Sequence, residues 1–332
     1  MIANLAVTYR CNSRCTTCSI WQIKNPPELT LGYIKNLFTM NSAFLQDVKS
    51  IQITGGEPTL HPQLPEIIET IHETLPRCTY WIPTNGQNPT KIKRIIEKTL
   101  ELLDGRGLGI SVSIDGNPET HNKTRGIKGS YRNAVNTLDK LKELGENYPE
   151  LALTVGMTIT GDNMNQIQDI YRLSREYDVD FSFRPAHTSE IYYRNTGNSH
   201  KISEKFIRDI QDISKDIRKR EGFLKSASTR TYMMGALRYM QTGRRELKCT
   251  AGSNSIYIDA YGDVYPCLFY PLKLGNIKQD TLENIYKSPQ AHLVREKIGK
   301  LECPQCWVEC EVYREINKIE AVLGSFTSQR SS

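Results

Sequence analysis

Three cysteines near the start of the chain have a spacing that suits an iron–sulfur cluster. Cys11, Cys15 and Cys18 are separated by three and by two residues. Thiolates are the usual ligands of a 4Fe–4S cluster, which takes four of them when it only carries electrons. Three ligands leave one iron open for a reacting molecule, as catalytic zinc sites keep one position free. The alternatives are three thiols without a shared role, or a zinc site, which would need a fourth ligand nearby, whereas the closest histidine is His61.

Five more cysteines gather near the end of the chain. Thiols that cluster in this way in a reduced compartment indicate metal ligands rather than disulfides. A tetrahedral zinc site is the alternative, because two pairs of cysteines bind zinc well. The remaining cysteine, Cys78, stands alone and is predicted to be a buried structural thiol. The five candidate ligands are Cys249, Cys267, Cys303, Cys306 and Cys310.

Polar and glycine-rich residues provide a third set of candidates, for contact with a bound ligand. Glycines let the backbone approach a ligand closely, the Glu57 carboxylate suits a ligand ammonium, and an arginine fork suits a carboxylate. Each has a structural alternative, since residues 54–58 and Asn85 fit ordinary turns and Arg184 fits an ion pair at a strand end. The residues in this set are Thr54, Gly55, Gly56, Glu57, Pro58, Asn85 and Arg184.

The elements that must position these residues are six short apolar runs that alternate with amphipathic segments. This alternation predicts a parallel sheet, because each parallel crossover carries a helix. Right-handed crossovers curve such a sheet toward a barrel. We therefore expect an α/β fold, a partial (β/α)6 barrel of the TIM type, with its active site at the C-terminal ends of the strands. The predicted strands are residues 2–7, 50–53, 79–83, 109–114, 153–159 and 180–184.

The second half of the chain does not continue the alternation of short apolar runs and amphipathic segments. Apolar residues at helical spacing predict a connecting helix that begins near residue 206. Turn residues at 260–263 predict a hairpin between strands at 255–258 and 264–267. We expect four parts: a barrel at 1–195, a helical linker at 196–245, a small iron–sulfur domain at 246–320 and a flexible tail at 321–332.

Composition and charge exclude some classes of protein. The chain has 332 residues, of which 38% are hydrophobic and 24% charged, so a globular fold is expected. No run of about 18 apolar residues occurs, and the start does not resemble a signal peptide, so we expect a cytoplasmic protein without a membrane partner. Residues 201–248 contain 13 Lys or Arg against 6 Asp or Glu. A solvated helix face explains this excess, so no nucleic acid is expected as a partner.

The cysteine triplet resembles the signature of radical S-adenosylmethionine (radical SAM) enzymes. Further matches are the Gly-Gly-Glu-Pro motif within 54–58, the Thr-Asn-Gly segment at 84–86, and a Ser-x-Asp-Gly segment followed by His121-x3-Arg125. The resemblance implies that the open iron binds the amino and carboxylate groups of SAM. It assigns the amino group to 54–58, and the ribose and carboxylate to Ser113 and Arg125. The chain departs from the family at Thr17, where an aromatic residue is usual, and Trp21 is a candidate replacement.

The second cysteine group resembles the SPASM/twitch extension of the same family. The matching pattern is Cys249-x12-Gly262-x4-Cys267, followed by Cys303-x2-Cys306-x3-Cys310. A full SPASM extension carries seven cysteines and two auxiliary clusters. With five cysteines, this chain resembles the shorter twitch form with one auxiliary 4Fe–4S cluster. The expected ligands are the first four of the five, and Cys310 is left over or replaces one of them.

The resemblance implies an oxidoreductase or lyase type of enzyme that cleaves SAM reductively to a 5′-deoxyadenosyl radical, which then removes a substrate hydrogen. One expected substrate class is a peptide, matured through thioether, carbon–carbon or related bonds. The other is a sugar, aminocyclitol or nucleotide sugar that is dehydrogenated, decarboxylated or joined through a carbon–carbon bond. Family frequency favours the peptide class slightly. A reductase, flavodoxin or ferredoxin would supply the electron. An iron–sulfur electron-transfer protein without SAM chemistry is the alternative of another class.

Overall fold

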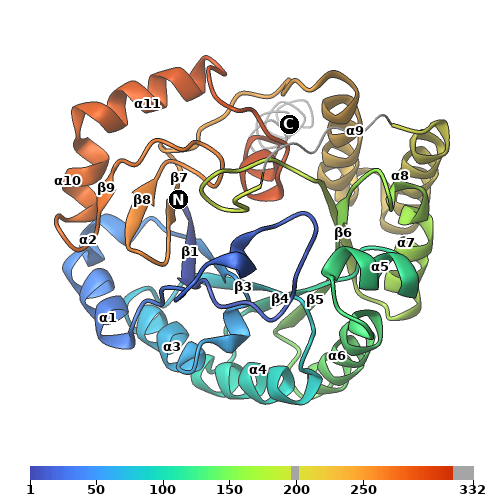
Figure 1. The fold of residues 1–332 in the computed structure, drawn as a ribbon, viewed down its shortest axis with the longest axis horizontal. Helices are drawn as coiled ribbons and strands as arrows, with labels where there is room; N and C mark the ends of the chain where they lie inside the picture. The colour runs from blue at the N-terminus through green and yellow to red at the C-terminus, as the bar shows by residue number, and fades with distance from the viewer. Residues whose placement is uncertain (196–201, 317–332) are drawn as a thin grey trace, which may run out of the picture.

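The computed structural model describes residues 1–195 and 202–316, and it shows a partial barrel of parallel strands surrounded by helices (Figure 1). Neighbouring strands pair in parallel and in chain order. Every predicted barrel strand is present, so the predicted α/β fold class is confirmed. The barrel strands are β1 (Ile2–Thr8), β2 (Ser50–Gly55), β3 (Thr79–Thr84), β4 (Leu108–Ser113), β5 (Leu151–Ile159) and β6 (Asp180–Pro185).

Helices cover the outer face of the sheet, because each parallel crossover returns through one. Their inward residues are apolar at helical spacing, as at Ile67, Ile68 and Ile71, which are buried in the main core. The helices are α1 (Leu31–Met40), α2 (Ser42–Leu45), α3 (Leu64–Thr74), α4 (Pro89–Leu103), α5 (Pro118–Arg125), α6 (Ser130–Gly145), α7 (Ile167–Glu176), α8 (Glu204–Lys225), α9 (Ala227–Thr242), α10 (Leu282–Lys287) and α11 (Pro289–Gly299), with 3-10 helices η1 (Ile20–Gln22), η2 (Pro58–Leu60) and η3 (Met164–Gln166).

The sheet continues past β1 into the C-terminal part of the chain. Strand β7 (Ser255–Ile258) pairs in parallel with β1, and β8 (Asp263–Tyr265) and β9 (Gly275–Asn276) follow in antiparallel order. The prediction of the second hairpin strand at 264–267 is wrong at its end, because β8 stops at Tyr265. Pro266 follows, and proline has no N–H to donate to the ladder. The C-terminal cysteines are therefore attached to the same sheet as the barrel.

Helices α8 and α9 pack against each other and against the barrel. The apolar residues that predicted the first of them, Phe206, Ile210 and Ile213 among others, are buried in the main core. In α9 the Tyr232 hydroxyl donates to the carbonyl of Phe183 in β6, at 2.9 Å. No helix in the described ranges is both long and apolar enough to span a bilayer. The boundaries of the four parts stay a prediction, and the tail at 321–332 lies outside the described residues.

Candidate active site

The loop that carries the cysteine triplet leaves the C-terminal end of β1 and is held first by the end of β2. The Gly56 N–H donates to the Thr8 carbonyl, and the Glu57 N–H donates to the Arg10 carbonyl, both at 2.8 Å. A side chain at Gly56 would place its Cβ 2.3 Å from the Arg10 carbonyl oxygen. The Gly-Gly pair therefore lets β2 approach the chain that leads to Cys11.

The end of α5 holds the middle of the same loop. The Arg14 N–H donates to the Arg125 carbonyl and the Thr16 N–H to the Thr124 carbonyl, both at 2.9 Å. A Cβ at Gly126 would lie 2.4 Å from the Arg14 carbonyl oxygen, and Gly126 ends the helix with a φ of 65°. Only glycine combines a positive φ with so close an approach of the Arg14 carbonyl. The end of α5 can therefore pack directly against the cysteine loop.

The segment after β6 closes the third side of the loop and brings two tyrosines with it. The Ser19 N–H donates to the Tyr193 carbonyl, and the Asn195 side chain donates to the Thr17 carbonyl, both at 2.8 Å. Tyr192 and Tyr193 line the resulting pocket, with ring centroids 4.7 Å apart. Neither tyrosine was predicted to be a site residue, because no motif marks them.

Trp21, the candidate replacement for the missing aromatic residue at position 17, does not line the pocket. Its side chain is 37% exposed, and its indole N–H donates to the Cys15 carbonyl at 3.4 Å. The aromatic wall of the pocket comes instead from the segment after β6, because backbone contacts fix that segment against the cysteine loop.

One pocket gathers nearly all of the candidate residues at the C-terminal ends of the strands. Pro58 is the exception, since it is buried in η2 outside the lining. The structure thus brings together candidates from the ends of β2, β3, β4 and β6, from the end of α5 and from the cysteine loop. The candidates that line the pocket are Cys11, Cys15, Cys18, Thr54, Gly55, Gly56, Glu57, Asn85, Ser113, Arg125 and Arg184.

The Glu57 carboxylate joins the ends of β2 and β3. It accepts hydrogen bonds from the Thr84 hydroxyl at 2.9 Å, from the Asn85 N–H at 2.7 Å and from the Thr59 hydroxyl at 2.6 Å. The side chain is 2% exposed, and burial raises the pKa of this carboxyl. With so many internal partners, Glu57 holds the pocket wall in shape. Asn85, positioned in this way, donates to the Asn12 side chain at 2.8 Å and approaches the Cys11 sulfur at 4.0 Å.

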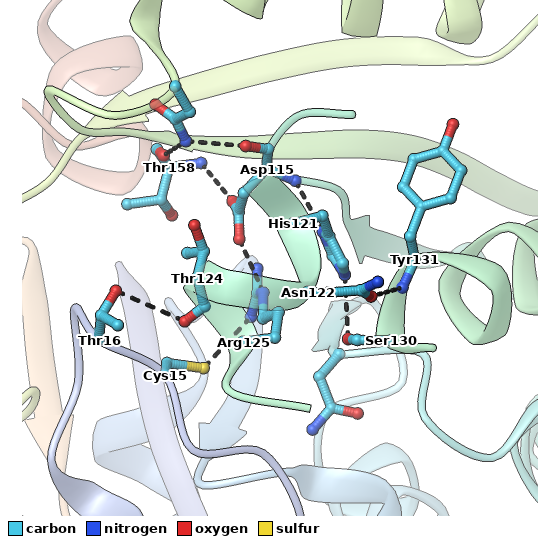
Figure 2. Close-up of polar contacts among 12 residues, drawn as sticks. Cys15, Thr16, Asp115, His121, Asn122, Thr124, Arg125, Ser130, Tyr131 and Thr158 are labelled. Atoms are coloured by element: carbon cyan, nitrogen blue, oxygen red, sulfur yellow. Dashed lines mark hydrogen bonds and ion pairs between the residues drawn. The ribbon is translucent and has the colours of Figure 1, made fainter. Parts of the chain in front are cut away.

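Arg125 and Arg184 are the cations of the pocket, and their surroundings differ. Arg125 lies against Asp115 and Cys15 (Figure 2). The side chain of Arg184 makes no hydrogen bond or ion pair with residues 1–195 or 202–316, although its backbone is paired with β5. Burial alone would lower the pKa of Arg184, but Glu309 and neighbouring tyrosines hold it above its ordinary value. An arginine that stays protonated and lines a cavity is suited to bind an anionic group of a ligand.

The three thiols fit the needs of a cluster with one open iron. They lie on one loop and line one pocket, and two of them receive side-chain N–H groups, Cys11 from Asn85 and Cys15 from Arg125. Burial raises the pKa of Cys11 to about 12 and that of Cys18 to about 11, so iron must displace protons to bind. Within the described ranges no His, Cys, Asp or Glu side chains converge on a single-ion site. A 4Fe–4S cluster needs no such convergence, because each cysteine binds a different iron.

A second cavity contains the C-terminal cysteines. Cys310 is outside its lining, although it packs against the same buried cluster as Cys267 and Cys306, beside Tyr9 and Tyr257. Burial raises the pKa of Cys249 to about 11, as expected for a thiol in an enclosed site. The cavity is therefore a candidate for a cluster with four protein ligands. The cysteines that line it are Cys249, Cys267, Cys303 and Cys306.

The segment that carries Cys303 to Cys310 is fixed over the barrel by Trp307. The Trp307 ring lies on Gly235 of α9, where a Cβ would come within 2.0 Å of it. The indole N–H donates to the Tyr232 carbonyl at 3.0 Å. His187, which follows β6, contacts the Trp307 carbonyl at 3.1 Å through Nε2. These contacts join the second cysteine cavity to the wall of the first pocket.

Arg245 organises the second cavity and was not predicted from the sequence. It is 3% exposed, and its guanidinium donates to the carbonyls of Leu247 at 2.9 Å, Cys306 at 3.3 Å and Glu311 at 3.0 Å. The buried guanidinium of Arg245 thus connects the segment before Cys249 to the segment around Cys306. The only sequence signal was an arginine just ahead of a cysteine, inside a basic run.

We expect Arg245→Met to lower the free energy of unfolding by about 3 kcal/mol or more. Each buried carbonyl left without a donor costs about 1–3 kcal/mol. The measurement is urea unfolding followed by circular dichroism. Arg244→Met is the matched control, because it removes the same charge from the exposed neighbouring position. Equal losses in the two variants would contradict the role given to Arg245.

Two sequence profiles match this chain. The radical SAM superfamily profile matches residues 5–174, and the SPASM iron–sulfur cluster-binding domain profile matches residues 249–311. The chain belongs to the radical SAM superfamily. Within it, the second match places the chain in the subgroup that carries a SPASM domain, as the resemblance in the sequence predicted.

Individual relatives cover most of the chain. The antilisterial bacteriocin subtilosin biosynthesis protein AlbA of Bacillus subtilis (strain 168) is 26% identical and covers 93% of this chain and 63% of its own length. The sporulation killing factor maturation protein SkfB of the same strain is 27% identical and covers 90% and 67%. The structure of Streptococcus suis SuiB bound to precursor peptide SuiA has a TM-score of 0.61 at 17% identity, over 89% of this chain and 66% of that one. This last likeness shows the shared fold.

Proposed function

We propose that this chain is an oxidoreductase or lyase type of radical SAM enzyme that removes a hydrogen atom from a peptide substrate during its maturation. The observation that carries the proposal is the single pocket in which three cysteines and two arginines meet. When bound at Cys11, Cys15 and Cys18, the cluster supplies the electron that splits SAM into methionine and a 5′-deoxyadenosyl radical. The electron comes from outside the chain, from a reductase, flavodoxin or ferredoxin.

The residues of the pocket bind and orient SAM. The 54–58 segment takes the amino group, Ser113 the ribose and Arg125 the carboxylate. The buried Glu57 carboxylate holds the ends of β2 and β3 together, so that Thr54 and Asn85 keep their places. Tyr192 and Tyr193 restrict water at the open side, which protects a radical from side reactions.

The second cavity would hold one auxiliary 4Fe–4S cluster, with the four lining cysteines as ligands. Four protein ligands leave no open iron, which suits a cluster that transfers electrons. The cavity adjoins the pocket through His187 and Trp307. An electron left on the substrate after hydrogen removal would therefore have a nearby acceptor.

A peptide is the proposed substrate class because the relatives AlbA and SkfB are named for the biosynthesis of a bacteriocin and of a killing factor, and SuiB is bound to a precursor peptide. The test uses reconstituted protein, SAM and dithionite. A short peptide encoded beside this protein should lose mass or gain a crosslink, and deuterium at the reacting carbon should appear in 5′-deoxyadenosine. Transfer of deuterium from a sugar or aminocyclitol instead would replace the peptide class. If no 5′-deoxyadenosine forms, the proposal that this chain cleaves SAM is contradicted.

Arg184 is proposed as a second cation for bound SAM. We expect Arg184→Met to weaken SAM binding by about 2–4 kcal/mol, the usual loss when one partner of a charge pair is removed from an enclosed site. The measurement is anaerobic titration calorimetry on reconstituted protein. Arg194→Met is the control, because Arg194 is exposed and lies over the rings of Tyr9 and Tyr261. Wild-type affinity in the Arg184 variant would remove this residue from the SAM site.

A further inference from the structure

The last residue of α5 makes a contact that the binding of a SAM carboxylate does not explain. The Nη1 atom of Arg125 donates toward the Cys15 sulfur at 3.8 Å, while Nε pairs with Oδ2 of Asp115 at 2.7 Å (Figure 2). The side chain of Arg125 is 13% exposed and that of Asp115 only 1%. A charged N–H group is thus directed at one of the three sulfurs in a largely enclosed site.

The Asp115 carboxylate is held in place on several sides, so the arginine that it holds is oriented as well. The other oxygen of Asp115 accepts from the Thr158 N–H at 3.0 Å, and its carbonyl accepts from the Asn163 side chain at 2.9 Å. Its own N–H donates to Nδ1 of His121 at 3.0 Å. Figure 2 shows Arg125 between Asp115 on one side and Cys15 on the other. The positive group therefore faces the sulfur, and the carboxylate lies behind it.

This arrangement has a physical consequence for an iron–sulfur cluster. Hydrogen bonds to the sulfurs, local charge and solvent exposure set the reduction potential of such clusters. A donor directed at a ligand sulfur stabilises the reduced form, which carries one more negative charge. The carboxylate of Asp115 offsets part of the effect, but the guanidinium lies between it and the sulfur (Figure 2). Screening by salt is weak for groups buried in this way.

We propose that Asp115 positions Arg125, and that Arg125 raises the reduction potential of the cluster held by Cys11, Cys15 and Cys18. The inference rests on the proposed function, because it requires that cluster. It is compatible with a SAM contact, since Arg125 has five N–H donors, of which Nη1 donates toward Cys15 while Nε forms the ion pair with Asp115. Arg125 is thereby a part of the electron-accepting step as well as of the binding of SAM.

The test is the midpoint potential of this cluster without SAM, measured by a redox titration followed by electron paramagnetic resonance. The signal is assigned as the one that Cys15→Ala removes. In Arg125→Met the equilibrium constant for reduction should fall about tenfold, which is about 59 mV for a one-electron couple. Arg14→Met is the matched control, because it removes the same charge from an exposed position on the same loop and should leave the midpoint unchanged.

If Arg125→Met keeps its full iron content and the midpoint potential measured without SAM is unchanged, the proposal is overturned. Arg125 would then act only in the binding of SAM. An equal shift in Arg14→Met would also overturn it, because a general charge effect would then explain the result. If Arg125→Met loses iron, Arg125→Gln replaces it, since glutamine keeps a polar side chain and removes the charge. A lower midpoint in that variant supports the proposal, and an unchanged one overturns it. Failure of wild-type protein to cleave SAM would affect only the proposed function, because these potentials are measured without SAM.

Discussion

Replacement of Cys15 with alanine is expected to abolish the reductive cleavage of SAM. The cluster would lose one of three protein ligands, and the N–H group of Arg125 would lose its sulfur. The measurement is 5′-deoxyadenosine formed by anaerobically reconstituted protein with dithionite and SAM. Product should fall below detection, because the remaining pocket residues cannot supply the electron.

Cys78→Ala is the matched control for this experiment. Cys78 is 1% exposed and belongs to the main core, away from the pocket lining. Its replacement removes a buried thiol without touching the cysteine loop, so cleavage should continue at the wild-type rate. Undiminished 5′-deoxyadenosine in Cys15→Ala would contradict the central assignment of the triplet. Loss in both variants would indicate general damage to the core instead.

The barrel was predictable because its signals are local. Each strand is a short apolar run beside an amphipathic helix, and the order of elements then limits the topology to a few choices. The pairing of β7 with β1 was not predictable in this way. Ile2 lies opposite Ser255, and no local pattern marks two segments so far apart as neighbours. The C-terminal part was therefore predicted as a separate hairpin.

The cysteines and the charged residues of the pocket could be picked out as candidates because their types and spacing fit little besides metal and ligand binding. The contacts that hold the loop in place were not, since most of them are backbone hydrogen bonds, such as those from Arg14 and Thr16 to the end of α5. Backbone donors are the same at every residue, so they leave no mark in a sequence. Gly126 carried the available signal, a glycine just after a helix.

Residues whose role depends on burial were the hardest to find. Arg245 lies in a basic run that suggested a solvated face, yet it is buried among carbonyls. Glu57 was predicted to face a ligand ammonium, and the structure surrounds its carboxylate with hydroxyl and N–H groups of the chain. In both cases the residue type was informative, but the partner depended on how distant segments meet.

The reconstituted protein is expected to hold about eight irons, in two clusters of four. The triplet and the second cavity are separate groups of thiols, so each should assemble its cluster without the other. Replacing the three cysteines of the triplet together should leave about four irons and no SAM cleavage. Replacing Cys249 and Cys267 should also leave about four, with SAM cleavage largely kept and product formation lost. The measurement is iron and labile sulfide per chain, with Mössbauer spectra to identify the cluster type.

Single replacements then separate the ligands from the remaining thiol. Cys310→Ala should keep all the iron, because Cys310 lies outside the lining of the second cavity, whereas Cys306→Ala should lose the auxiliary cluster. The two residues are close in sequence, so each variant is a control for damage caused by the other. If Cys310→Ala lost the auxiliary cluster and Cys306→Ala kept it, Cys310 would be the ligand. The 303–310 segment would then have to change conformation when iron binds. Zinc in place of iron in the triplet variant would make the second cavity a structural zinc site and end its assignment to electron transfer.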